Sequence, residues 1–267
     1  MTQPDEPRHR PAAPASPSFA AELGRVLFPG ETALDPATLA HIAATYDETL
    51  RRAGPTPNSV LWHDRPSQVV RFRKLLKVLG PDARTRGLVI NDLGCGYGAL
   101  FAYLRRKRVL RGGRYFGYDL SPDMVAAAAR LHRRDPRATF VHASEATEEA
   151  DFSFASGTYG LMLDANRPAW EAWVRDSLRR LAAKSRRGLA FNMLDARGPD
   201  DRHSLYYADP AATLAFCREE LGARARIIDT YTPYDFTILC RFDGVELTAG
   251  RAAPRRITWW NRWLPFL

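Results

Sequence analysis

Short apolar runs alternate with longer segments of helical periodicity through most of this chain. The runs are rich in β-branched and aromatic residues, which is typical of buried strands. We expect strands at residues 88–93, 115–118, 139–142, 152–155, 188–194, 225–229 and 236–242. We expect helices near residues 98–108, 122–134, 168–184 and 209–221. This alternation predicts an α/β fold of βαβ units around a mostly parallel sheet.

The chain before this pattern has a different character. Residues 1–17 contain many prolines and little that can pack, so we expect a disordered tail. Residues 18–80 predict an N-terminal helical cap, with one helix after Asp35 and Pro36 and a second from about Asp64 to Leu79. The second helix shows a polar face with Gln68 and Arg71. Residues 81–244 then form the main domain, and residues 245–267 a basic, aromatic tail.

Composition narrows the class of protein. Hydrophobic residues make up 45% and charged residues 26%, which suits a globular protein with a sizeable core. The three cysteines are scattered and odd in number, which argues against a disulfide framework and against a structural zinc site. No run of residues is long and apolar enough to span a membrane, and we expect a cytoplasmic protein.

The segment from Val89 to Ala99 carries the clearest chemical signal. A strand runs into three alternating glycines, Gly94, Gly96 and Gly98, and then into a helix, which allows close backbone approach to a ligand. The same spacing also satisfies a loose dinucleotide fingerprint. Asp92 argues against a dinucleotide, because a carboxylate there repels a pyrophosphate. It suits a ligand whose nearest groups are an ammonium and a sulfonium. The expected cofactor is S-adenosylmethionine.

A second acid follows the next strand. Asp119 comes 25 positions after Gly94, at a strand's carboxyl end, where it can accept both hydroxyls of a ribose. Leu120 or Met124 can flank an adenine ring.

These residues resemble the class I S-adenosylmethionine-dependent methyltransferases, in the stretches NDLGCGYG and YFGYDLSPDM. The resemblance covers roughly residues 60–242. More narrowly, the chain resembles a group of small bacterial methyltransferases without a settled substrate. It implies a Rossmann-like doubly wound sheet of about seven strands whose last strand is antiparallel. Where the family often has a glycine-acid pair after the third strand, this chain has Ala143 and Ser144, followed by Glu145. The adenine contact is therefore expected from Ser144, Glu145 or a backbone amide.

Most of the site residues are expected at the carboxyl ends of the strands, where open α/β sheets bind ligands. For Trp62 and Arg71, in the cap, the resemblance of the set Trp62, Gln68, Arg71 and Phe72 to the small bacterial group supports the prediction. The cofactor-binding residues that we predict are Arg71, Asp92, Gly94, Gly96, Asp119, Leu120, Ser144 and Ser156. The predicted acceptor-binding residues are Trp62, Thr158, Tyr206, Tyr207 and Tyr234. Arg71 is expected to pair with the methionyl carboxylate. Asn192 and His203 are catalytic candidates, although Asn192 can equally serve to bond the neighbouring backbone.

The sequence shows no metal-ligand cluster, catalytic cysteine setting or Asn-Pro-Pro-Tyr-type amide clamp, so we expect methyl transfer to the O or N atom of a small molecule. Two alternatives stay open: an RNA-binding or RNA-modifying protein, and a protein that binds the cofactor without catalysis. The net charge of +9 and the Trp/Arg tail also suit nucleic acid or a membrane surface. We favour solvated cations at Arg105–Arg114 and tail tryptophans that pack on the protein.

Overall fold

The structure is a computed structural model that describes residues 34–198 and 202–247. The predicted tail at residues 1–17 lies outside the described residues, as does the C-terminal tail from residue 248.

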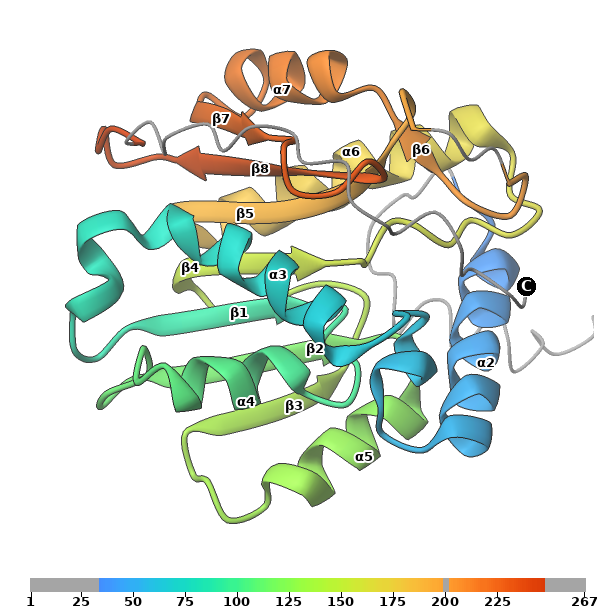
Figure 1. The fold of residues 1–267 in the computed structure, drawn as a ribbon, viewed down its shortest axis with the longest axis horizontal. Helices are drawn as coiled ribbons and strands as arrows, with labels where there is room; N and C mark the ends of the chain where they lie inside the picture. Colours follow the sequence, from blue (N-terminus) through green and yellow to red (C-terminus); the bar gives the residue numbers. More distant parts are fainter. Residues whose placement is uncertain (1–33, 199–201, 248–267) are drawn as a thin grey trace, which may run out of the picture.

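An eight-stranded sheet forms the centre of the fold (Figure 1). Its strands are β1 Val89–Leu93, β2 Arg114–Asp119, β3 Ala138–His142, β4 Ala150–Ser156, β5 Ser185–Asp195, β6 Tyr207–Ala208, β7 Arg224–Ile228 and β8 Asp235–Arg241. The order is β3-β2-β1-β4-β5-β8-β7, with the two-residue β6 paired to β5. Strand β8 is antiparallel to both of its neighbours, and the strands from β1 to β5 are parallel. The predicted fold class is confirmed. The extra strand β6 was missed because two residues carry no periodic pattern.

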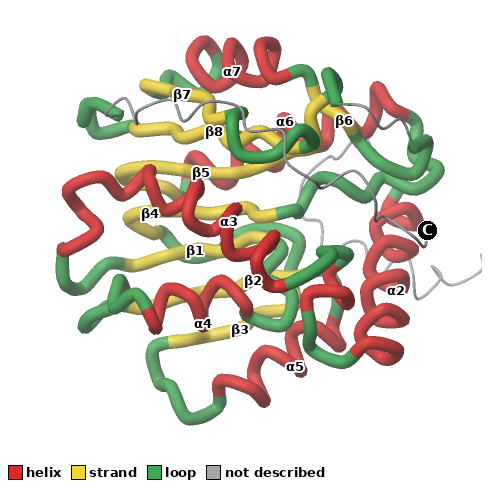
Figure 2. Tube along the Cα trace, viewed as in Figure 1, coloured by secondary structure: helices red, strands yellow, loops and turns green. Residues whose placement is uncertain are grey.

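Helices cover both faces of the sheet (Figure 2). Helices α3 Arg65–Leu75, α4 Ala99–Arg106 and α5 Pro122–His132 lie on one face, and α6 Arg167–Ala183 and α7 Pro210–Glu219 lie on the other. One apolar core joins α3 and α4 to the sheet, with Phe72, Leu100 and Phe154 among its members. A second core joins α6 and α7 to the sheet through residues such as Trp170 and Phe216. Both cores leave the carboxyl edge of the parallel strands free to build a site.

The helices begin where the sequence signals predict. Each of five helices has a proline in its first turn and an N-cap side chain that accepts a backbone amide, which satisfies one of the free amides at the helix start. These N-cap residues are Asp35, Asp64, Ser121, Asn166 and Asp209. At Asp64 the cap is reciprocal, because Ser67 also bonds back to the Asp64 backbone.

The N-terminal segment forms a cap beside the carboxyl edge (Figure 1). It contains α2 Pro36–Ala53 and the 3₁₀ helix η1 Pro57–Val60. The Thr49 hydroxyl donates a hydrogen bond of 2.6 Å to the Ser59 carbonyl and so ties η1 to α2. The predicted helix after Asp35 is confirmed, and the second predicted helix divides into α3 and the 3₁₀ helix η2 Leu76–Arg84.

Strand β8 holds α3 and η2 at two points. At its end, the fully buried Arg241 donates to the Val78 carbonyl over 2.9 Å and pairs with Asp82 over 2.9 Å. At its start, Asp235 pairs with Arg71 of α3. Displacing either partner of a buried ion pair would leave the other charge buried and unpaired, so these contacts fix α3 and η2 along β8.

Candidate functional site

The glycine loop between β1 and α4 is shaped so that side chains are excluded. Gly94, Gly96 and Gly98 have φ angles of +71°, +52° and +80°, a region that side chains rarely adopt. A Cβ on Gly94 would lie 2.6 Å from the Thr158 hydroxyl, and one on Gly96 would lie 2.9 Å from a methyl of Val60. The loop therefore needs glycine both for its turn and for the approach of its neighbours.

Asp119 ties this loop to the end of β2. Its carboxylate accepts the Gly96 amide over 2.7 Å and the Ser121 amide over 2.9 Å. Burial raises the pKa of Asp119, and these two amides act in the opposite direction. The same acid thus shapes the loop and stands at the position where the sequence predicts ribose binding.

Asp92 lies in β1 directly before the loop and is almost fully buried. The Tyr115 hydroxyl donates to one carboxylate oxygen, while the other, Oδ1, has no hydrogen-bond partner among the described residues. Burial raises the pKa of Asp92 to about 7. A buried carboxylate oxygen without a partner is costly, so this oxygen is suited to receive a cationic ligand group.

The cap closes over the loop. Val60, Trp62 and Gln68 line a cavity of about 30 Å³ together with Asp92 and the glycine loop. The Trp62 ring also lies against the turn after β4, since a Cβ on Gly157 would be 2.6 Å from it. These cap residues therefore lie against the glycine loop, and what they bind there stays a prediction.

Arg71 lies buried between its helix and the sheet. Gln68 and Arg71 are 5% and 8% exposed, so the polar face of α3 is turned inward. The buried Asp235 carboxylate pairs with Arg71 across the contact between α3 and β8. The contact of Arg71 with the methionyl carboxylate stays a prediction. The Arg71 guanidinium also lies 4.1 Å from the centre of the Trp62 ring, and its Nε has no partner among the described residues.

The ends of β4 and β5 supply three further polar side chains. The Asn192 amide oxygen accepts the Gly157 amide over 3.1 Å, so of the two uses left open for Asn192 the structure shows the bond to neighbouring backbone. The Thr158 hydroxyl donates to the Leu93 carbonyl over 2.7 Å. The Ser156 hydroxyl lines the cavity at the loop and has no hydrogen-bond partner among the described residues.

Comparisons with known proteins identify the family. A family model described as a methyltransferase domain matches residues 90–189. A Mycobacterium tuberculosis protein named as a candidate methyltransferase is 40% identical over 154 residues, which cover 57% of this chain and 92% of that protein. The chain belongs to the class I S-adenosylmethionine-dependent methyltransferases. S-adenosylmethionine, the cofactor expected from Asp92 and the glycine loop, is the cofactor of this family.

Solved structures share the fold of this methyltransferase. Phosphoethanolamine N-methyltransferase 2 of Haemonchus contortus, in complex with S-adenosylmethionine, has a TM-score of 0.54 at 13% identity and covers 73% of this chain and 59% of its own. Magnesium protoporphyrin IX methyltransferase of Synechocystis PCC 6803, with bound S-adenosylhomocysteine, has a TM-score of 0.53 at 16% identity and covers 77% and 98%.

The sequence predicts that the adenine of the cofactor lies at the end of β3. The Ala143 amide donates to the Asp119 carbonyl over 3.1 Å, and Glu145 pairs with Arg180 of α6 over 3.0 Å. The Glu145 carboxylate and the Ala143 amide therefore each have another partner. The half-buried Leu120 lies beside this edge, where its carbonyl is 2.9 Å from the His142 ring nitrogen.

The predicted acceptor tyrosines lie outside the cavity at the glycine loop. Tyr206 and Tyr207 are buried around β6, and burial raises the pKa of Tyr206 to about 12. Tyr234 is half-buried before β8, where its carbonyl accepts the Asp195 amide over 2.8 Å. His203 is exposed on a loop next to residues 199–201, which lie outside the described residues.

No group of three His, Cys, Asp or Glu side chains in residues 34–198 and 202–247 could hold a metal ion. In the same residues, no helix is long and apolar enough to cross a membrane. The three cysteines are buried and free.

Sequence reasoning missed two residues of the site. Asp235 becomes visible only when β8 is paired with α3, although an acid at the start of a fully buried strand is itself unusual. Val60 covers Gly96 and carries no sequence signal, since one apolar residue in a loop has no periodicity to read.

Proposed function

We propose that this methyltransferase acts on the O or N atom of a small-molecule acceptor that is enclosed beneath its N-terminal cap. The observation that carries the proposal is the contact of the cap with the glycine loop, through Val60 on Gly96 and Trp62 on Gly157. An enclosed site favours an acceptor small enough to fit between the cap and the ends of the strands.

The charges and open hydrogen-bonding atoms support a definite orientation of the cofactor. Asp92, with its unpartnered Oδ1, would receive the ammonium group, and Asp119 would accept the ribose hydroxyls. Gly94 and Gly96 would allow the backbone of the loop to come close to the cofactor. The other residues proposed to bind the cofactor are Arg71 at the carboxylate, Leu120 and Ser144 near the adenine, and Ser156 beside the methionine end.

S-adenosylmethionine supplies an activated methyl carbon when bound, so the protein's task is to align the acceptor and exclude water. An amine acceptor needs no strong base, whereas a hydroxyl benefits from one. His203 is the proposed base for that case. Asn192 holds the Gly157 amide, and we assign it the role of fixing the turn beside the acceptor. Trp62, Thr158, Tyr206, Tyr207 and Tyr234 are proposed to surround the acceptor.

The proposal includes an organisation of the chain. Residues 18–80 form the cap, residues 81–244 the methyltransferase domain, and residues 1–17 and 245–267 two tails without a part in the cofactor site. A cytoplasmic location belongs to the same proposal.

The acceptor class is tested with methyl-labelled S-adenosylmethionine. The full chain is incubated separately with a small-molecule extract, with RNA and with protein from the same cells. We expect enzyme-dependent label in the small-molecule fraction, and none with the Asp119→Ala variant. Label in RNA would favour the RNA-modifying alternative, and no transfer to any fraction would favour cofactor binding without catalysis.

Arg71→Lys tests the carboxylate contact while it keeps a cation beside Asp235. We expect affinity for S-adenosylmethionine to fall by about fivefold, because lysine lacks the planar fork that binds a carboxylate through two parallel bonds. Affinity for adenosine, which has no carboxylate, should stay unchanged. Calorimetric titration with both ligands checks this, and equal losses for the two would reduce Arg71 to a structural partner of Asp235.

Deletion of the chain from Arg251 onward tests the tail. We expect unchanged affinity for S-adenosylhomocysteine, because the proposed cofactor residues all precede it. Calorimetric titration of the truncated and full-length proteins measures the affinity. Loss of binding in the folded, truncated protein would place part of the cofactor site in the tail.

A further inference from the structure

Positive charge is distributed very unevenly along this chain. Residues 65–118 hold 13 of the 39 Lys and Arg residues but two of the 30 Asp and Glu residues. Those two acids, Asp82 and Asp92, are both buried. The rest of the chain has slightly more acidic than basic residues, so the whole positive excess lies on α3, η2, α4 and their connections.

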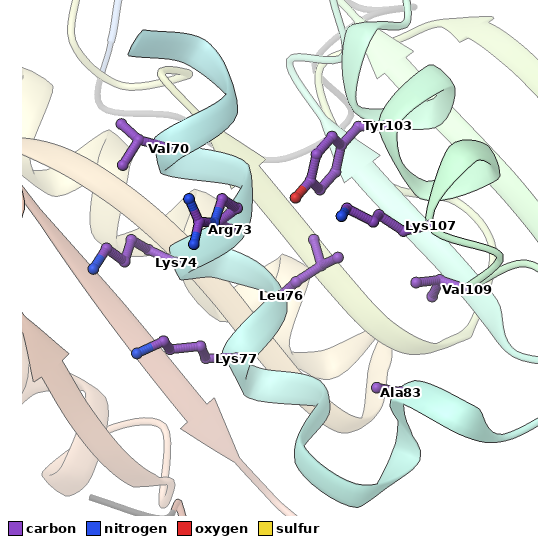
Figure 3. A pocket seen from close by; sticks show the side chains of 9 residues that line it. All are labelled: Val70, Arg73, Lys74, Leu76, Lys77, Ala83, Tyr103, Lys107 and Val109. Atoms are coloured by element: carbon purple, nitrogen blue, oxygen red, sulfur yellow. The ribbon is translucent and has the colours of Figure 1, made fainter. Parts of the chain in front are cut away.

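A groove of about 500 Å³ lies within this region, between the α3–η2 segment and the end of α4 (Figure 3). Val70, Leu76 and Val109 give it an apolar lining. The Tyr103 hydroxyl and the Lys107 ammonium point from α4 toward η2 (Figure 3). The residues that line this groove and those that line the cavity at the glycine loop do not overlap.

The groove gathers cations that carboxylates leave unpaired. Its lining includes Arg73, Lys74, Lys77 and Lys107, and no carboxylate of the described residues lies within ion-pair distance of any of them. Three of the four lysines of this arginine-rich chain are in this set. Elsewhere, arginines such as Arg137 and Arg197 have carboxylate partners.

The cations also crowd one another. Burial and the neighbouring charges of Lys77 and Arg73 lower the pKa of Lys74, whose ammonium lies 5.3 Å from the centre of the Tyr231 ring. Lys74 and Lys77 both extend away from α4 (Figure 3). On α4, the Lys107 ammonium and the Arg106 guanidinium lie 5.9 Å and 5.7 Å from the centre of the Tyr103 ring. Uncompensated like charges are unfavourable in a folded protein, and an anion between them relieves the repulsion.

The shape of the region indicates which anion fits. The groove has the volume of a small-molecule site, and its apolar lining suits a ring or chain next to the charged groups. A nucleic-acid surface uses exposed aromatic side chains to stack bases. Among the described residues, the large hydrophobic side chain that is exposed is Leu131, which is not aromatic. A membrane contact needs a flat or convex surface rather than a groove.

We propose that this groove binds a small molecule carrying two or more phosphate groups, which Arg73 and Lys107 hold above the apolar lining, while the charge of Lys77 adds attraction from the far side of the helix. The site is separate from the methyl-transfer site and does not depend on the acceptor. Lysine and arginine bind phosphate through charge-assisted hydrogen bonds, so neutralising three of them removes most of the attraction.

The test compares two triple variants of the full chain. Arg73→Gln/Lys77→Gln/Lys107→Gln neutralises the groove, and Arg130→Gln/Arg133→Gln/Arg134→Gln makes the same charge change at exposed positions on and after α5. Calorimetric titration uses ATP and inorganic tripolyphosphate, with sodium chloride adjusted to equal ionic strength. We expect the groove variant to lose at least about tenfold in affinity for both ligands and the α5 variant to match the wild type.

Binding of S-adenosylhomocysteine serves as the control for folding and should be the same in all three proteins. Equal affinities of the two triple variants for ATP and tripolyphosphate would overturn the proposal, as would no binding by the wild type. Titration with polyuridylic acid and with phosphatidylserine vesicles at the same salt tests the other sources of phosphate. Tighter binding of either one than of ATP would overturn the proposal in favour of nucleic acid or a membrane.

Discussion

Replacing Asp119 by alanine should weaken binding of S-adenosylmethionine by about 30- to 150-fold, or about 2 to 3 kcal/mol, which is the range for hydrogen bonds to a charged group. The ribose hydroxyls lose their acceptor. The glycine loop also loses an anchor, because the Gly96 and Ser121 amides both bond to this carboxylate. Adenosine contains the same ribose, so its affinity should fall by a similar factor.

Asp123→Asn is the matched control, because Asp123 is an exposed acid in the first turn of α5 and close to Asp119 in the sequence. Calorimetric titration of both variants with S-adenosylmethionine and adenosine provides the comparison, and circular dichroism verifies the fold. If the Asp119→Ala protein is folded and binds both ligands as tightly as the control, the ribose assignment is wrong.

Replacing Asp92 by asparagine should weaken cofactor binding and at the same time stabilise the folded protein. At pH 8 the variant should lose roughly 100-fold in affinity for S-adenosylmethionine, because a buried charge pair loses one partner. Its free energy of unfolding should nevertheless rise by about 1 to 2 kcal/mol, because a buried carboxylate with one unpartnered oxygen is replaced by a neutral amide. Adenosine has no ammonium group, so its affinity should change little.

The stability gain depends on pH in a defined direction. Burial raises the pKa of Asp92 to about 7 from the ordinary value of 3.8, so the folded protein holds a proton that the unfolded chain releases first. The wild type therefore loses stability as the pH rises from about 4 through 7, and the loss is complete above 7. The advantage of Asp92→Asn should be large at pH 8 and small at pH 5.

Ligand binding should show the opposite dependence on pH. Below about pH 7, Asp92 of the free protein is neutral, so pairing with the ammonium requires loss of a proton and affinity for S-adenosylmethionine falls. Urea unfolding and calorimetry at pH 5 and pH 8 measure both effects. An affinity of the wild type that is the same at the two pH values, or an unfolding free energy of Asp92→Asn that is no higher at pH 8, would contradict the assigned role.

Most of the fold can be read from local signals. Strand β1, helix α5 and strand β5 lie within a few residues of their predicted ranges, because apolar runs, proline in the first turn and capping side chains act over short stretches of chain. The division of the second cap helix into α3 and η2 was not predicted. It reflects the attachment of η2 to Arg241, which lies more than 150 residues away.

The site divides in the same way. Asp92, the glycine loop and Asp119 can be found from sequence because strand-end chemistry occupies fixed offsets from each strand. The pairing of Arg71 with Asp235 cannot, because the two residues are 164 positions apart in the chain and meet only when α3 packs on β8. Asn192 could be narrowed to two uses, and the choice between them needed the position of Gly157.

The sequence by itself thus determined the order of strands and helices along the chain and the cofactor class, and it predicted the two acids proposed to bind the cofactor. These depend on propensity, turn geometry and charge within short windows of the chain. The tertiary structure decided which partners those groups meet: Val60 on Gly96, Trp62 on Arg71, and Asp235 opposite Arg71. It also decided the raised pKa of Asp92 and the groove of unpaired cations. Burial and pairing depend on how distant segments pack together, and that packing is a property of the whole fold.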